Sequence, residues 1–421
     1  MSTRARETLE VVLDDATLGP TAIIGSLRCE RRGSTEVVSF EYDRDYLDAR
    51  HAVAIDPQLP LLPGPSHPVR GQRLFGIFRD AAPDRWGRML MERREALEAG
   101  EAGRRIRHLS EWDFLTGVSD FTRMGALRLR DPAQPRTFVD NRELGAPPAA
   151  RLRALQAIAR ALSHDDAEQQ PGYAKWLTQL VAPGTSLGGA RPKATFTAED
   201  GALWLAKFPA HDDRRDIGAW EYLAWRLAPR ANIAIPDARL LRFGRGHRTF
   251  ATQRFDRTNR SRRLYASAMT LLMRDDGDSG SYLDLAQAIQ MHGDPAGIAD
   301  DLTQLYRRVV FSILIGNRDD HLRNHGFLRT PHGWRLAPAF DLNPNPDKRE
   351  HALAIDANDP SPSVRHLHAT HRHYRLSADQ ATAIEDEVRR AVTAWRVVAA
   401  ELKLSRLAQG QLDSIIDATR D

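Results

Sequence analysis

Cysteine is almost absent from this 421-residue chain, which contains only Cys29. A single cysteine excludes an intramolecular disulfide and favours a reducing compartment, so we expect a cytoplasmic protein. Long apolar runs are absent too. No stretch reaches the roughly 18 apolar residues of a membrane helix, and the first residues contain no apolar signal-peptide core. We therefore expect no membrane partner.

Lysine is also scarce, because arginine supplies almost all of the positive charge. The planar guanidinium of arginine and the compact ammonium of lysine are not interchangeable at a phosphate site. A lysine in this chain can therefore indicate a position that needs its chemistry, and Lys193 and Lys207 are the strongest candidates. The lysines of the chain are Lys175, Lys193, Lys207, Lys348 and Lys403.

Neither charge nor composition identifies a partner. The formal net charge of +4 and the pI of 9.3 describe a mildly basic protein, which is too weak a signal to indicate nucleic acid. The hydrophobic content of 42% is sufficient for a large core, and the length indicates two or three domains.

The pattern along the chain predicts three domains. Residues 1–140 alternate apolar and polar residues in three stretches before a helical stretch begins, which indicates a small α+β unit. Residues 141–256 begin with a patch rich in proline and alanine and continue with short strands, so we expect a β-rich lobe. Residues 257–421 are mostly helical and predict an α-rich lobe.

Two local patterns are specific enough to predict single elements. Residues 194–208 predict a hairpin with Asp200 and Gly201 at its turn. Residues 377–404 predict one helix that begins with a capping box of Ser377 and Gln380. The apolar face of that helix consists of Ile384, Val388, Val392, Trp395 and Ala399.

The stretch 315–326, IGNRDDHLRNHG, follows directly on an apolar run that predicts a buried helix. Asp319 and Asn324 are five residues apart, and Asp341 follows a second predicted hairpin. Phosphoryl transfer needs one carboxylate to accept the proton of the attacking hydroxyl, and an amide oxygen and a second carboxylate to hold Mg²⁺. The alternative is a capped helix end, where Asp and Asn satisfy backbone groups of a turn.

The segment upstream supplies the other parts of a kinase site. Such a site needs a strand lysine that reaches the phosphates, a helix glutamate that holds this lysine, and a glycine-bearing turn. Lys207 ends a predicted strand, Glu221 lies on the next predicted helix, and SLGGARPKA is the turn. Taken singly, Lys207 also fits an edge-strand lysine, Glu221 a solvated helix residue and SLGGARPKA an ordinary turn. Their occurrence together in this order favours a kinase.

These segments together resemble the HipA family of bacterial toxin kinases over nearly the whole chain. The resemblance implies an α+β fold with a two-lobed core similar to protein kinases. This core would have a β-rich N-lobe and an α-helical C-lobe, preceded by an extra N-terminal α/β subdomain. The matching segments are SLGGARPKA, LWLAKFP, TQRFDR, LIGNRDDHLRNHGFL, GWRLAPAFDLNP and LFGIFRDAAPDRWGR.

The resemblance also implies residue roles in a serine/threonine protein kinase that uses ATP and Mg²⁺. Asp319 would be the catalytic base, Asn324 and Asp341 the Mg²⁺ ligands, and Lys207 a contact to the ATP phosphates, supported by Glu221. The backbone at 253–254 would meet the adenine edge. The implied ATP-binding residues are Gly188, Gly189, Ala190, Arg191, Lys193, Lys207, Gln253, Arg254, Phe255, His321, Asn324 and Asp341. Phe255 also fits an ordinary core aromatic, and His321 a structural role.

Family members are inactivated by autophosphorylation of a serine just before the phosphate-binding turn, which implies Ser186 here. A phosphoserine would bring almost two negative charges to a place suited to ATP phosphates and would compete with the nucleotide. Thr185 is adjacent, so the modified hydroxyl stays open between the two. The alternative is a serine that caps the turn through its hydroxyl.

Two departures from the family pattern bear on the site. Pro192 stands in the glycine-bearing turn and removes one backbone N–H that would otherwise be available to phosphate. Asp320 stands beside Asp319 and makes the choice of base ambiguous, although the five-residue spacing to Asn324 selects Asp319.

A histidine cluster near the C-terminal end invites a metal interpretation. A structural zinc site normally shows tighter mixed Cys and His spacing, and the one cysteine is remote, so we expect an exposed basic loop. The cluster consists of His366, His368, His371 and His373.

Three functional hypotheses follow. The first is a growth-arresting toxin kinase, neutralised by a small helix-turn-helix (HipB-like) antitoxin and through it brought to operator DNA. Its substrate would be a cellular protein, for which an aminoacyl-tRNA synthetase is the family precedent. The second is a small-molecule kinase, and the third a catalytically silent co-repressor that acts on DNA with its antitoxin. A shared fold does not transfer a target, so the sequence leaves the substrate open.

Overall fold

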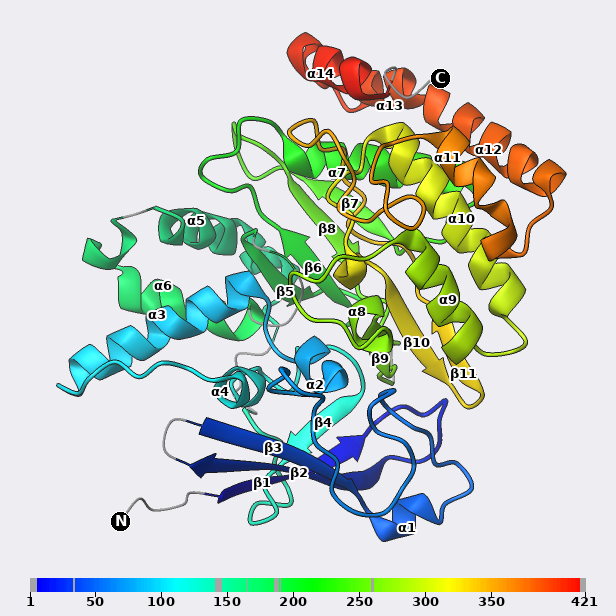
Figure 1. Ribbon diagram of the computed structural model, residues 1–421. Helices are drawn as coiled ribbons and strands as arrows, with labels where there is room; N and C mark the ends of the chain where they lie inside the picture. The colour runs from blue at the N-terminus through cyan, green and yellow to red at the C-terminus, as the bar shows by residue number, and fades with distance from the viewer. Residues whose placement is uncertain are drawn as a thin grey trace. The chain divides into compact units, whose positions relative to one another are not determined.

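The chain forms two compact units in the computed structural model (Figure 1). Unit 1 contains Met1–His211 and Asp256–Ala266, and unit 2 contains Asp212–Phe255 and Ser267–Asp421. The predicted segment 141–256 is thus divided between the units, and the three-domain division stays a prediction. The structure describes residues 6–32, 35–140, 146–164, 166–184, 189, 191–258 and 261–416.

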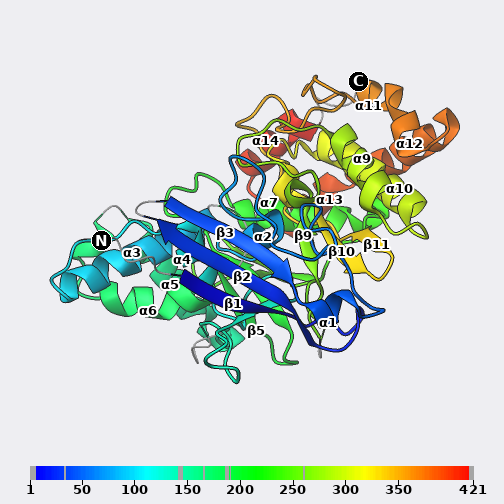
Figure 2. The same ribbon diagram turned by 60° about the horizontal axis from the view of Figure 1, so that its bottom comes forward.

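Unit 1 begins with a four-stranded antiparallel sheet in the order β3-β2-β1-β4, three strands of which lie side by side in Figure 2. Its strands are β1 (Arg6–Leu13), β2 (Ala22–Arg32), β3 (Thr35–Tyr42) and β4 (Leu127–Arg130). The three alternating stretches predicted in this region are β1, β2 and β3. Alternate residues such as Val11, Leu27 and Val38 are buried, as the period of two requires.

Unit 1 also contains helices, and the predicted helical stretch near residue 85 is α3. Among them α6 packs against both α3 and α5 (Figure 1). The N-cap of α3 is Asp84, whose carboxylate accepts a hydrogen bond from the Gly87 N–H at 2.8 Å. The helices are α1 (Arg44–Leu47), α2 (Gly76–Asp80), α3 (Arg85–Glu101), α4 (Glu111–Thr116), α5 (Leu152–Leu162) and α6 (Tyr173–Gly184).

The predicted hairpin at 194–208 is confirmed. Strands β5 (Lys193–Thr197) and β6 (Leu203–Lys207) pair antiparallel, with Lys193 opposite Lys207. Gly201 has a φ of +84°, a left-handed conformation that glycine adopts without steric cost, and this places it in the turn as predicted. The strand β9 (Tyr265–Ser267) follows later in the chain.

Unit 2 contains two further hairpins. One pairs β7 (Ala238–Leu241) with β8 (Thr249–Gln253), and helix α7 (Ile217–Leu227) packs on both strands. The other pairs β10 (Gly326–Thr330) with β11 (Gly333–Leu336) and confirms the second predicted hairpin.

The buried α10 is the central helix of unit 2, and α9, α11, α12 and α14 pack around it. The capping box of Ser377 and Gln380 is confirmed at the start of α12. The predicted single helix over 377–404 is wrong, because a tight turn at Ala394 separates α12 from α13. The helices are α8 (Ala268–Leu271), α9 (Tyr282–His292), α10 (Ile298–Ile315), α11 (Val364–Ala369), α12 (Ala378–Thr393), α13 (Trp395–Glu401) and α14 (Arg406–Ile416).

The histidine cluster is helical, so the expected loop is wrong, although His366 and His373 are exposed as expected. His366 and His368 lie on α11, while His371 and His373 form part of the 3₁₀ helix His371–Tyr374. His368 Nδ1 lies 2.9 Å from Glu385 Oε1 on α12, which ties the cluster to the helical core. Within the described ranges, no group of three His, Cys, Asp or Glu side chains is arranged to hold a metal.

Across the residues that the structure describes, no helix combines the length and the apolar character needed to cross a membrane.

His351 is a buried histidine in unit 2 and lies 6.4 Å from the ring of Tyr282, with only 4% of its surface exposed. Both ring nitrogens lack a hydrogen-bond partner among the described residues. Burial lowers the pKa of His351 from its ordinary 6.5 to about 4, because the charged imidazolium would lose its hydration.

We predict that His351 makes unit 2 sensitive to acid. The unfolded chain takes up a proton below pH 6.5 and the folded chain only near pH 4, so stability is complete above pH 6.5 and falls as the pH drops. At pH 5 this site should cost about 2 kcal/mol of unfolding free energy. Urea unfolding at about pH 7.5 and pH 5 should show a smaller pH difference in His351→Leu than in the wild type. The exposed His332 is the control, and an equal pH difference in His351→Leu would contradict the prediction.

Candidate functional site

The polar stretch 315–326 begins where α10 ends, and glycine makes the end possible. Gly316 has a φ of +70°, and a Cβ added there would lie 1.9 Å from a side-chain carbon of Ile415. The N–H groups of Gly316 and Asn317 donate to carbonyl oxygens of the last helical turn, the latter to Ser312 O at 2.8 Å. Gly316 and Asn317 therefore cap α10, and Asp319 has no part in this cap. The Asn324 side chain does satisfy a backbone carbonyl of the following turn, as the alternative predicts.

Beyond the cap, side chains alternate between solvent and core. Asp319 and His321 are exposed, whereas Asp320 and Leu322 are buried. His321 has extended backbone angles, which place successive side chains on opposite sides of the chain. The candidate base Asp319 therefore faces outward, with 58% of its side chain exposed.

Asn324 lies beside Asp319, as the predicted roles require. The 3₁₀ turn Leu322–Asn324 brings the chain back, and Asn324 Nδ2 donates to the Asp319 carbonyl oxygen at 3.4 Å. This hydrogen bond orients the amide and leaves its Oδ1 as an oxygen donor. The two residues are thus brought together by a turn whose backbone is closed by the hydrogen bond from Asn324 N to His321 O at 2.8 Å.

The segment that carries Asp341 is fastened to the same helix end. Asn343 N donates to Asn317 Oδ1 at 3.2 Å, and Asn345 N donates to Gly316 O at 2.8 Å. Asp341 itself is half-buried and has a φ of +57°, a left-handed conformation that Asp tolerates better than most residues. The three polar residues of the predicted constellation therefore come from two neighbouring segments of unit 2.

An aromatic contact joins the predicted adenine segment to the Asp341 segment. The rings of Phe255 and Phe340 lie 5.4 Å apart, and both are half-buried. The Gln253 N–H donates to Asp237 O at 2.8 Å, so this backbone donor is used within unit 2. Arg254 is buried.

Lys207 and Glu221 lie where the sequence predicts them, and their pairing stays a prediction. Lys207 is the last residue of β6 in unit 1 and is half-buried. Glu221 lies on α7 in unit 2 and is 4% exposed, so the alternative of a solvated helix residue is wrong.

The glycine-bearing turn is described only in part. Gly189 is exposed with a φ of +106°, and Arg191 is half-buried. Lys193 is almost completely buried, and its Nζ donates to Asp84 and to the Gly189 carbonyl oxygen. The Pro192 carbonyl oxygen accepts a hydrogen bond from Phe208 N at 2.8 Å and extends the β5–β6 hairpin. The predictions on Thr185, Ser186, Gly188 and Ala190 concern residues outside the described ranges.

Asp320, whose role the sequence leaves open, is a buried anchor. Its carboxylate accepts a hydrogen bond from the Tyr282 hydroxyl at 2.8 Å and lies 3.1 Å from His325 Nε2. Burial alone would raise the pKa of Asp320, but the charge of His325 and the hydrogen bonds from His325 and Tyr282 outweigh it and lower that pKa. Asp320 thus fixes the segment to α9 and does not face solvent as a base must.

Lys348 is the residue that the motifs miss. Its ammonium forms an ion pair with the Asp319 carboxylate. The loop that carries it runs along residues 315–326, because Arg318 donates to the Lys348 carbonyl at 2.7 Å and Ala352 N donates to Arg318 O at 3.0 Å. The scarcity of lysine was the only sequence signal that pointed to this position.

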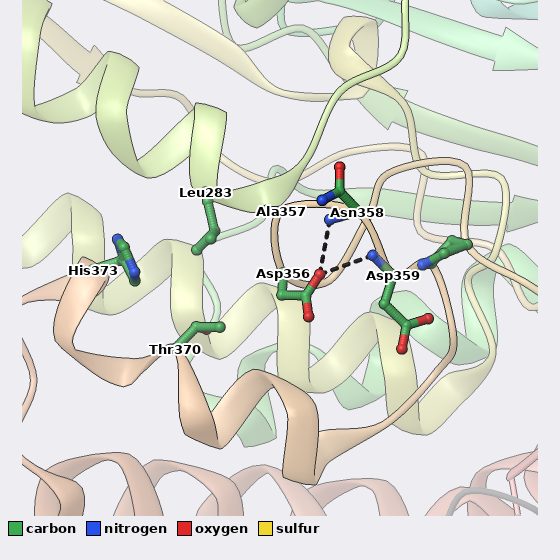
Figure 3. A pocket seen from close by; sticks show the side chains of 8 residues that line it. Leu283, Asp356, Ala357, Asn358, Asp359, Thr370 and His373 are labelled. Carbon is green, nitrogen blue, oxygen red and sulfur yellow. Dashed lines mark hydrogen bonds between the residues drawn. The ribbon is translucent and has the colours of Figure 1, made fainter.

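An open hollow in the described surface lies elsewhere (Figure 3). It has a volume of about 560 Å³ and contains none of the predicted site residues. Its Asp356 carboxylate accepts hydrogen bonds from the backbone N–H groups of Asn358 and Asp359 at 2.8 Å, which closes the loop on itself (Figure 3). The hollow is lined by this turn together with Leu283 of α9, Thr370 and His373.

Two family models match the chain: the HipA N-terminal domain over residues 16–129 and the HipA-like C-terminal domain over residues 185–395. A similar solved structure is that of HipA of the Shewanella oneidensis MR-1 toxin–antitoxin system in complex with HipB and its operator DNA. The TM-score is 0.67 at 17% sequence identity, over 97% of this chain and 95% of that one. This likeness confirms the predicted α+β fold class.

Two curated relatives are named "Putative kinase", from Haemophilus influenzae, and "Putative kinase Y4dM", from Sinorhizobium fredii. The first is 23% identical over 38% of this chain and 52% of its own length. The second is 27% identical over 34% of this chain and 37% of its own length. The chain thus spans about half or less of the length of these relatives.

Proposed function

The chain belongs to the HipA family, and from this premise we propose that it is a kinase that transfers the γ-phosphoryl group of ATP to a serine or threonine of a cellular protein. The observation that carries the proposal is the assembly at the end of α10. There an outward-facing carboxylate, Asp319, stands beside Asn324, and the Asp341 segment is hydrogen-bonded to the same helix cap.

Asp319 would accept the proton of the attacking hydroxyl. Its exposure allows a protein substrate to approach, and its backbone is held by Asn324 on one side and by the buried Asp320 on the other. Asn324 and Asp341 would hold Mg²⁺, which prefers oxygen ligands, and the orientation of Asn324 fits because its Nδ2 is engaged and its Oδ1 is not. When bound, Mg²⁺ neutralises charge on the nucleotide phosphates.

The other predicted groups would hold the nucleotide itself. Backbone groups at Gln253 and Arg254 would meet the adenine edge, and Phe255, packed on Phe340, would line the purine. Lys207, supported by Glu221, and His321 would contact the phosphates together with the glycine-bearing turn.

A toxin kinase explains the chain better than the two other hypotheses. A small-molecule kinase has no need of the HipA N-terminal domain that residues 16–129 match. A catalytically silent co-repressor has no need of an exposed carboxylate beside an oriented amide.

By analogy with the Shewanella protein, solved with HipB and operator DNA, we propose a HipB-like antitoxin as partner, and through it operator DNA. The substrate would be a cellular protein such as an aminoacyl-tRNA synthetase, with growth arrest as the consequence.

Asp319→Asn should abolish phosphotransfer while the fold survives. Removal of the base should lower transfer of labelled phosphate from ATP by at least about a hundredfold. Because Asp319 is exposed, the free energy of unfolding should change by less than about 0.5 kcal/mol. Chelation of Mg²⁺ should stop transfer by the wild type.

Asp320→Asn is the matched variant and should differ from Asp319→Asn by a clear loss of stability. Its carboxylate is buried against His325 and Tyr282, so its loss should cost about 1–3 kcal/mol of unfolding free energy in urea titrations. Full transfer by Asp319→Asn, or loss of transfer by Asp320→Asn without loss of stability, would show that the base is misassigned.

Lys348→Met should lower kcat, because the ammonium pairs with Asp319 and would orient it and stabilise phosphoryl charge nearby. We expect a loss of about ten- to a hundredfold, with little change in KM for ATP. Steady-state kinetics with labelled ATP measure both constants, and the exposed Lys403→Met is the control. A higher kcat in Lys348→Met would mean that the lysine blocks the base. An unchanged kcat would mean that the ion pair has no part in transfer.

Ser186→Ala should keep the enzyme active. Incubation of the wild type with ATP and Mg²⁺ should lower its activity with time as phosphate accumulates on residue 186, because the added charge competes with nucleotide phosphates. Mass spectrometry locates the phosphate, and Thr185→Ala, which should still lose activity, is the control. Inactivation of Ser186→Ala at the wild-type rate would contradict the prediction.

A further inference from the structure

Two segments of unit 1 that are more than a hundred residues apart form one hydrogen-bonded cluster. The Asp84 carboxylate caps α3 through Oδ1, which accepts from Gly87 N at 2.8 Å. Its other oxygen, Oδ2, accepts from Lys193 Nζ at 2.6 Å. The start of α3 is therefore tied to the start of β5, immediately after the glycine-bearing turn.

The same cluster fixes the last part of that turn. Lys193 Nζ donates to the Gly189 carbonyl oxygen at 2.8 Å, and Trp86 N approaches the same oxygen at 3.4 Å. In return, the indole Nε1 of Trp86 donates to the Lys193 carbonyl oxygen at 3.2 Å. Gly189 has a φ of +106°, a conformation that favours glycine, and a Cβ there would lie 3.1 Å from Lys193 Nζ.

Burial makes the cluster rigid. The side chains of Lys193 and Asp84 are 2% and 8% exposed, and Trp86 is buried. A buried ammonium that is hydrogen-bonded to a carboxylate and a carbonyl has strong directional partners and no water to replace them. The position of the Gly189 carbonyl is therefore determined by α3.

Helix α3 also holds the other flank of the turn. It packs against α6, which ends at Gly184, and Arg93 on α3 donates to the Leu162 carbonyl oxygen at the end of α5 at 2.5 Å. The residues that precede and follow the turn thus rest on the same helix (Figure 1).

We propose that Asp84, Trp86 and Lys193 are positioning residues that hold Gly189, in the described end of the glycine-bearing turn, in place for nucleotide phosphates. This inference rests on the proposed kinase function. Lys193 would act through Gly189 and not as an ATP ligand, which differs from the role that the resemblance implies. The segment around Asp84 would then be the means by which the N-terminal part of the chain acts on nucleotide binding.

Asp84→Asn is the primary test, because it keeps the side-chain shape and removes the charge that neutralises Lys193. Hydrogen exchange in the nucleotide-free protein should speed up in peptides that contain Gly189 and Arg191. In the full-length enzyme, KM for ATP should rise about tenfold or more while kcat changes less, since misplaced groups weaken binding. Trp86→Phe, which removes only the indole donor, should shift both readouts in the same direction by less.

Glu95→Gln is the matched control. Glu95 is a buried carboxylate on the same helix and pairs with Arg104 at 2.5 Å, remote from the turn in sequence. It should lower the melting temperature without a change in exchange at Gly189 or in KM for ATP. If Asp84→Asn behaves like Glu95→Gln, the cluster stabilises the fold only and the proposal is wrong.

The two proposals fail in distinguishable ways. Exchange at Gly189 is measured without nucleotide, so it tests the positioning cluster even if the wild type transfers no phosphate. If the wild type transfers no phosphate but exchange is faster in Asp84→Asn, the proposed kinase function is wrong. The cluster would then still position Gly189. Unchanged exchange in both Asp84→Asn and Trp86→Phe would overturn the cluster, whatever the kinase activity.

Discussion

The arrangement of the site depends on one buried carboxylate. Asp320 is withdrawn from water and is compensated by the Tyr282 hydroxyl and by His325, which fixes its segment against α9. Because the chain is extended there, anchoring Asp320 turns Asp319 and His321 to the opposite side, toward solvent. A residue with no chemical task in phosphoryl transfer thus determines where the candidate base points. Loss of a partner from such a buried group is costly, so the orientation is firmly held.

The end of α10 holds the neighbouring segments in place. Gly316 terminates the helix in the left-handed conformation, and its carbonyl, with the side-chain amide of Asn317, receives backbone N–H groups from the segment after Asp341. The segments of the candidate carboxylates Asp319 and Asp341 are therefore held at one helix terminus, although more than twenty residues separate the two in the sequence. A hairpin, β10–β11, spans that separation and returns the chain to the same place.

The sequence predicted the elements better than their partners. Periodicity and turn residues were sufficient for the β5–β6 hairpin, for the capping box at Ser377 and for Glu221 on its helix, because these depend on neighbours within a few residues. The break at Ala394 and the helical histidine cluster were missed, since apolar periodicity continues across the first and polar composition conceals the second. The burial of Asp320 and the contact of Lys348 with Asp319 depend on segments far along the chain, for which a single sequence contains no signal.

The scarcity of lysine takes on a physical meaning in this light. Lys193 lies in a space with 2% exposure, where one ammonium bridges the Asp84 carboxylate and the Gly189 carbonyl. The five donors of a guanidinium would need more acceptors than such a space offers, and an unpaired buried donor costs more than a hydrogen bond gains. Lys348 meets Asp319 at the surface, where a compact charge on a flexible stem can follow a carboxylate during a reaction. At Lys193 and Lys348, in a chain that uses arginine almost everywhere else, lysine provides a small, single charge beside one carboxylate.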